Sequence, residues 1–258
     1  MNAELWDNLG FFLTRLRGLP SCESLTLPGG FCLSTGSGSA SENWAFLPGI
    51  VPDGALVEAV LRFFGERGLP FIWPVEAPLE NQAKGTEALA MAGLHDAGRL
   101  VVMCRGVDGL PEGNLSVALR PVLTPEDALG WAEAAWRGFD GDAPAPGPFR
   151  ALADAMRGDA PALYLASARI GDEDVGTCLL ALPPFPGAGG VYYFATVPEH
   201  RRRGVAAAMM AEAARLARSR GLKRIILQST PSGLPFYRSA GFEPLGGLAL
   251  FSTSPDVF

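Results

Sequence analysis

Apolar and polar residues after position 114 alternate in a way that predicts a regular succession of strands and helices. The stretch 115–122 alternates as a half-buried strand does. Thr124 can then cap a helix that has Pro125 in its first turn and acids at its positive end. The predicted elements are strand 115–122, helix 124–137, helix 149–156, strands 162–168, 175–182 and 191–197, helix 204–220, strand 222–228, helix 234–240 and strand 247–252.

The first 110 residues carry a weaker pattern of the same kind. Helices are expected at 4–17 and 54–67, and strands at 70–75 and 99–107. The turn-rich segment 108–114 separates the two halves. The sequence therefore predicts an α/β (α+β) protein with a smaller domain over 1–110 and a second domain over 115–258.

Composition limits the class of protein. The chain has 258 residues, of which 48% are apolar, so two modest cores are easily filled. No apolar run is long enough for a membrane span, and Glu4 and Asp7 do not fit a secretion signal, so we expect a cytoplasmic protein that avoids membranes. Few lysines beside many alanines, glycines and prolines suggest a bacterial source.

Charge and cysteine spacing exclude some kinds of site. The net charge of −6 argues against nucleic acid as a partner and is compatible with a cationic substrate. The four cysteines show no C-x-x-C spacing, and His95 and His200 are the two histidines. We therefore expect reduced thiols and no metal.

One segment, 195–207, has the pattern of an anion site. It leaves a strand, turns at Pro198 and enters a helix with Gly204 near its start. The first amides of a helix have no intrahelical partner and face outward with the positive end of the dipole, so they suit a pyrophosphate. Gly204 removes the side chain where a ligand comes closest, and three arginines precede it.

The same segment resembles the acetyl-CoA signature of the GNAT superfamily of N-acetyltransferases. That signature, Arg/Gln-x-x-Gly-x-Gly/Ala, is Arg201-x-x-Gly204-x-Ala206 here. The pattern is short, but the order of elements agrees, and 236–242, Phe-Tyr-Arg-Ser-Ala-Gly-Phe, resembles the closing signature of the family. The resemblance spans about 115–251 and implies a mixed, mostly antiparallel sheet flanked by helices, with acetyl-CoA as cosubstrate.

Site residues follow from that resemblance position by position. The resemblance implies that strand residues meet the pantetheine arm, that the turn holds the pyrophosphate, and that Tyr237 protonates the departing thiolate. The implied coenzyme-binding residues are Phe194, Ala195, Thr196, Arg201, Arg202, Arg203, Gly204, Val205, Ala206, Ala207, Ser229 and Tyr237. A tyrosine phenol holds its proton at neutral pH. A positioned phenol can therefore donate that proton to the departing thiolate and recover one from solvent.

The group that deprotonates the acceptor amine is not identified by the sequence. The candidates are Tyr192 and Tyr193 on the strand, Asp140 and Asp142 in a loop, and Glu199 and His200 at the turn, and none of them is assigned. Tyr237 also has a plain alternative role as a packed aromatic.

A weak internal repeat links the two halves. Gly68-Leu69, a strand, a helix and Ala92-Gly93-Leu94 match Gly221-Leu222, a strand, a helix and Ala240-Gly241-Phe242. This resembles a tandem GNAT protein whose first domain is degenerate, because 48–54 lacks the arginine pattern. An unrelated small α/β domain is the alternative. In either case we expect this half to shape the substrate cleft or a homodimer contact without binding acetyl-CoA.

The leading hypothesis is therefore transfer of an acetyl group from acetyl-CoA to a primary amine of a small molecule or peptide. The alternatives are an acyl-CoA-binding or regulatory module without turnover, and a transferase with a different acyl donor.

Overall fold

The computed structural model describes residues 3–78, 85–109, 117–159, 162–184, 187–255 and 257. The helices are α1 Ala3–Arg17, α2 Gly54–Gly65, α3 Glu87–Met91, α4 Pro125–Gly138, α5 Gly147–Arg157, α6 Val205–Ser219 and α7 Leu234–Ser239, with 3-10 turns η1 Ala40–Glu42 and η2 Pro198–His200. The strands are β1 Glu23–Leu27, β2 Gly30–Ser34, β3 Trp44–Phe46, β4 Ile72–Ala77, β5 His95–Gly106, β6 Ala118–Pro121, β7 Leu163–Ile170, β8 Glu173–Ala181, β9 Ala188–Thr196, β10 Arg224–Ser229 and β11 Glu243–Ser252.

All of these strands form one continuous sheet in the order β1-β2-β3-β4-β11-β5-β10-β9-β8-β7-β6. Only the β3–β4 and β9–β10 pairs are parallel. The predicted fold class, a mixed and mostly antiparallel sheet flanked by helices, is therefore confirmed. The predicted order of elements after residue 117 is confirmed as well, with a capping box between Thr124 and Asp127 at the start of α4.

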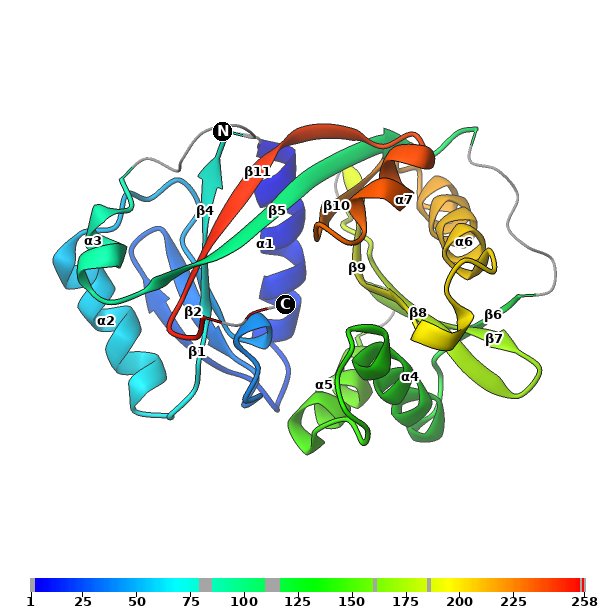
Figure 1. The fold of residues 1–258 in the computed structure, drawn as a ribbon, viewed down its shortest axis with the longest axis horizontal. Coiled ribbons are helices and arrows are strands. Elements are labelled where there is room, and N and C mark those ends of the chain that lie inside the picture. The colour runs from blue at the N-terminus through cyan, green and yellow to red at the C-terminus, as the bar shows by residue number, and fades with distance from the viewer. Residues whose placement is uncertain are drawn as a thin grey trace.

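Two long strands are exchanged between the halves of the molecule. β5 belongs to the first half of the chain but pairs with β10, whereas β11 ends the chain and pairs with β4. In Figure 1 the green β5 and the red β11 cross between the blue left half and the yellow-green right half. The boundary predicted at 108–114 falls largely on residues outside those described, and the two halves share β5 and β11 across it.

The internal repeat seen in the sequence has a structural counterpart. In both halves a helix ends, a strand follows and a short helix comes next, giving α2-β4-α3-β5 and α6-β10-α7-β11. All four helices end in the same turn, in which an amide bonds the carbonyl five residues before it. The donors are Leu69, Leu94, Leu222 and Phe242, at 3.2, 3.0, 3.0 and 2.9 Å. The preceding glycines, Gly68, Gly93, Gly221 and Gly241, all have positive φ.

Three cores fill the two faces of the sheet. One face carries α2 and α3 over the first half, and α6 and α7 over the second. The other face carries α1, α4 and α5, whose apolar residues form one shared core across both halves. Burial of this shared core, rather than the linker, holds the halves together.

Helix α1 docks directly on β9 of the second half. Asn8, which is buried, donates from Nδ2 to the carbonyl of Ala188 at 2.7 Å, and its Oδ1 accepts from the hydroxyl of Tyr192 at 2.7 Å. Gly190 makes this approach feasible, because a Cβ there would lie 1.8 Å from Asn8 Oδ1. The first half of the chain thus reaches the strand that the sequence analysis marked as functional.

Among the described residues, no helix has the length and apolar character needed to cross a bilayer.

Candidate functional site

The turn before α6 presents unbonded amides at its open end. Arg202 and Gly204 both have positive φ, 62° and 79°, and Gly204 is the N-cap without a capping side chain. The first amide that bonds back into the helix is that of Ala208, to the Gly204 carbonyl at 3.1 Å. The amides of Val205, Ala206 and Ala207 precede it, and they face the end of α6 where the dipole is positive.

The equivalent helix of the first half is closed to an anion. Asp53 caps α2, and its Oδ1 accepts from the Leu56 amide at 2.8 Å. A carboxylate of the protein therefore occupies the position that a phosphate would need. This arrangement agrees with the expectation that the first half does not bind the coenzyme.

The three arginines of the turn do not act alike. Arg201 turns back to the fold, where it donates to the carbonyls of Thr196 and Gly138 and pairs with Asp140 at 2.9 Å. Its guanidinium ties the end of α4 to β9 and is already paired. Arg202 and Arg203 are also exposed, and they directly precede Gly204 in the turn.

Strands β9 and β10 separate close to this turn. Their parallel pairing spans Ala188–Val191 on β9 and stops there. The next three residues, Tyr192, Tyr193 and Phe194, are all half-buried although β9 is an interior strand of the sheet. An interior strand whose aromatic residues reach solvent indicates an opening in the sheet at this point.

A β-bulge lies at the same point of β9. Against β8, Leu179 faces Tyr192 and Thr177 faces Ala195, so two residues of β9 stand opposite Cys178. Tyr193 has a φ of 45°, which is uncommon outside glycine and locates strain at this position. The hydroxyl of Thr177 donates to the Tyr193 carbonyl at 2.8 Å and holds the bulge.

The bulge directs neighbouring side chains to opposite faces of the sheet. Phe194 packs with Phe236 and Tyr237, at centroid distances of 6.1 and 6.0 Å, on the face of α6 and α7. Tyr193 packs with Trp131 and Phe149, at 5.5 and 5.7 Å, on the face of α4 and α5. The opening therefore connects the two faces of the sheet. One face carries the turn before α6, and the second face is lined by Tyr192 and Tyr193.

Tyr237 and Ser229 lie together on the first of these faces. A Cβ at Gly233 would be 3.0 Å from Tyr237 Cε2 and 3.3 Å from Ser229 Oγ. Tyr237 is buried, and burial raises the pKa of its phenol above the ordinary value. The phenol is therefore protonated at neutral pH, as a proton donor must be. The Ser229 hydroxyl bonds the Thr230 carbonyl at 2.8 Å.

Most of the groups considered as a base are engaged elsewhere. Glu199 pairs with Arg137 at 3.1 Å, and a hydrogen bond from its own backbone together with that arginine lowers its pKa. His200 Nε2 lies 3.2 Å from Glu173, and Asp140 pairs with Arg201. Tyr192 and Tyr193 remain at the opening.

A carboxylate that the sequence analysis did not consider lies beside them. Glu42 of η1 accepts a hydrogen bond from the Tyr193 hydroxyl at 2.5 Å. These two residues are 151 positions apart in the chain. No local motif signals the contact, because it arises from the docking of the first half on β9.

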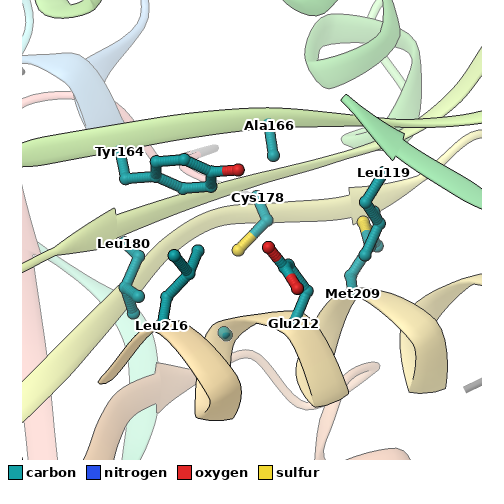
Figure 2. A pocket seen from close by; sticks show the side chains of 9 residues that line it. Leu119, Tyr164, Ala166, Cys178, Leu180, Met209, Glu212 and Leu216 are labelled. Carbon is teal, nitrogen blue, oxygen red and sulfur yellow. The ribbon is translucent and has the colours of Figure 1, made fainter. Parts of the chain in front are cut away.

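The cavity drawn in Figure 2 is separate from this site. It is about 10 Å³, room for one water at most, and lies between β6–β8 and the middle of α6. Its polar groups are Tyr164, Cys178 and Glu212, whereas the opening lies at β9 and β10. Within the described residues, no three or more His, Cys, Asp or Glu side chains gather as metal ligands would.

Comparison with known proteins gives a family for part of the chain. Residues 128–242 match the profile of the Acetyltransferase (GNAT) family. This span contains most of α4 and all of α5, α6 and α7, with the bulge, the opening and the turn described above. The search of curated proteins found no match.

Solved structures share the fold over the whole chain. A GCN5-related N-acetyltransferase from Kribbella flavida is 18% identical and covers 98% of this chain and 95% of its own, with a TM-score of 0.67. A tandem GNAT protein from the clavulanic acid biosynthesis pathway is 13% identical and covers 97% and 96%, with a TM-score of 0.59. At these identities the likeness is one of fold, and it extends to the first half.

Proposed function

Since the second half of this chain carries an acyltransferase domain of the GNAT family, we propose that it moves an acetyl group from acetyl-CoA to a primary amine. The amine attacks the thioester directly, the carbon–nitrogen bond forms, and the carbon–sulfur bond breaks. The donor and the acceptor are the parts of this proposal that go beyond the family.

The observation that carries the proposal is the opening between β9 and β10 beside the uncapped start of α6. In this proposal the amides of Val205 to Ala207 bind the pyrophosphate, together with the exposed Arg202 and Arg203. Phe194, Ala195 and Thr196 meet the pantetheine arm along the freed edge of β9, near Ser229. Arg201 shapes the turn through its bonds to Thr196 and Asp140.

Catalysis in this proposal uses the two sides of the same opening. The bulged backbone near Phe194 stabilises the oxyanion that develops on the acetyl carbonyl. Tyr237 donates its proton to the departing sulfur and recovers one from solvent. Its raised pKa keeps that proton in place before the reaction.

Calorimetric titration with acetyl-CoA tests the donor, with two glycine variants as a matched pair. Gly204 and Gly221 stand at opposite ends of α6, both with positive φ. Gly204→Glu puts a carboxylate at the proposed pyrophosphate site, whereas Gly221→Glu puts the same strain and charge at the far end of the helix. We expect binding to be lost in the first variant and retained in the second.

Equal loss of affinity in both variants would assign the effect to strain and remove the turn from the proposal. Binding without transfer to any amine would favour the alternative, an acyl-CoA-binding module. Binding of a longer acyl-CoA in preference to acetyl-CoA would favour the other alternative, a transferase with a different donor.

A further inference from the structure

The second face of the opening holds a buried carboxylate with no cation beside it. Glu42 is 8% exposed, and among the described residues no arginine, lysine or histidine forms an ion pair with it. Removing a carboxylate from water without a cation costs several kcal/mol. A cost of this size at a solvent-accessible opening points to a functional role.

The loop that carries Glu42 is fixed by its neighbour. Asn43 is fully buried and uses both ends of its side-chain amide. Its four partners are the amide of Thr35 at 3.1 Å and the carbonyls of Ser37, Ser39 and Pro70 at 2.8, 3.1 and 2.8 Å. Glu42 is therefore held in position before any ligand arrives.

Tyr193 connects this carboxylate to the opening. Its hydroxyl donates to Glu42, its carbonyl accepts from Thr177, and its ring packs against Trp131 and Phe149. It is nevertheless half-buried and not fully enclosed. Tyr193 thus extends from the buried carboxylate to the partly exposed stretch of β9 at the opening.

A further polar group faces the same opening from β10. Gln228 stands just beyond the last pair of β9 and β10, and its amide lies near the Tyr192 hydroxyl. Its Nε2 is buried and makes no well-formed hydrogen bond to any described residue. An amide N–H left open here suits a hydrogen-bond acceptor atom of a bound molecule, such as an oxygen, and does not suit an ammonium group, which only donates.

We propose that the acceptor substrate binds on this second face with its amine at the Tyr193 hydroxyl and an acceptor atom toward Gln228, and that Glu42 of the first half of the chain receives the amine's proton through that hydroxyl. The inference rests on the proposed acetyl transfer and adds the acceptor site and the route of the proton. It makes the first half of the chain part of the active site.

The protons of the proposed acetyl transfer balance. The ammonium gives one proton to the Tyr193 oxygen while the Tyr193 proton passes to Glu42, which leaves a neutral amine and a protonated carboxyl. The amine nitrogen bonds the acetyl carbon, and the bond to sulfur breaks. Tyr237 protonates the sulfur and is reprotonated by solvent, while the second nitrogen proton and the Glu42 proton leave to solvent. One proton is released per turnover.

The surroundings of Glu42 suit a base that works near neutral pH. Burial raises its pKa from the ordinary 4.5 to about 7, and the hydrogen bond from Tyr193 opposes that rise. The titratable groups that face it are the Tyr193 phenol from β9 and the Cys22 thiol after α1. Burial holds both of these groups protonated, so Glu42 is the group that accepts the proton.

Two nucleophiles distinguish a proton acceptor from a structural residue. 2-Phenylethylamine is an ammonium ion at neutral pH and suits a ring-lined face, whereas hydroxylamine is already neutral and has no need of a base before attack. We would measure coenzyme A release with each one over a pH series, in the full-length protein and in Glu42→Gln, Tyr193→Phe and the control Glu58→Gln. Glu58 is exposed and pairs with Arg62 in α2.

The expected result is a selective loss. Glu42→Gln and Tyr193→Phe lower kcat/KM for 2-phenylethylamine by about 100-fold or more, as loss of a general base does, and lower it for hydroxylamine by less than about 10-fold. The rising limb near pH 7 disappears with Glu42, and Glu58→Gln changes neither rate. Calorimetric affinity for acetyl-CoA stays near that of the unaltered protein, because Glu42 faces away from the coenzyme turn.

Equal losses with both nucleophiles, or a pH limb that survives Glu42→Gln, would overturn the inference and leave acetyl transfer standing. Binding of acetyl-CoA without transfer to either nucleophile would count against acetyl transfer and the amine site together, and would favour the acyl-CoA-binding module. If the unaltered protein does not bind acetyl-CoA, the proposed function and this inference fail together.

Discussion

Replacing Asn43 by alanine should destabilise the protein more than any ordinary polar substitution on a loop. The side chain makes four hydrogen bonds to backbone groups of the segment 35–39 and of Pro70, and it is fully buried. Nδ2 has two hydrogens for three carbonyls, so the side chain makes about three full hydrogen bonds, and at about 1 kcal/mol for each the free energy of unfolding should fall by about 3 kcal/mol. The melting temperature should fall by roughly 6–12 °C for a chain of this size.

Urea unfolding followed by tryptophan fluorescence measures this change, with Ser41→Ala as the control. Ser41 lies in the same loop and makes a single hydroxyl contact, to Ser39 at 3.0 Å, so its loss should cost less than about 1 kcal/mol. Equal effects of the two variants would refute the reasoning that Asn43 organises the loop. A drop of less than about 1 kcal/mol in Asn43→Ala would refute it as well.

Three further predictions concern the site and the exchanged strands. Tyr237→Phe should lower the rate of acetyl transfer by about 10-fold or more and leave calorimetric affinity for acetyl-CoA unchanged; an unchanged rate would remove the phenol from the mechanism. Because burial raises the Glu42 pKa to about 7, the folded state binds the extra proton, so the free energy of unfolding of the unaltered protein should fall relative to Glu42→Gln by about 3 kcal/mol as pH rises from about 4.5 to about 7. If the difference in free energy of unfolding between the two proteins, measured by urea unfolding, is the same at both pH values, the raised pKa is contradicted. A protease site inserted in the segment 110–116 should yield two fragments that still co-elute in gel filtration after cleavage, since β5 and β11 each pair with the other half; separate elution would contradict the exchange.

Local signals in the sequence were sufficient for most of the second half. Thr124 and Asp127 cap α4 as expected, and the positive-φ glycines end their helices where the pattern indicated. The strands β1, β2 and β3 of the first half were not predicted. β1 is largely exposed and β3 has three residues, so neither carries a period that distinguishes it from a loop.

The candidate site likewise has some parts that the sequence predicts and others that it does not. The turn at Gly204 and the position of Tyr237 follow from short segments whose geometry is set by nearby residues. The engagement of Arg201 with Asp140 and the contact of Glu42 with Tyr193 join positions far apart in the chain. Such contacts depend on how the halves dock, and the periodicity of a single strand or helix contains no record of that docking.

The exchange of β5 and β11 also has an evolutionary meaning. Each half completes its sheet with a strand encoded by the other, so a mutation that damages one half is felt by selection as damage to both. The first half can therefore be retained for its strands alone, whatever stands at the start of its helix α2, where Asp53 is the cap. Two halves joined in this way can differ in chemistry, but neither can be removed without taking a strand from the sheet of the other.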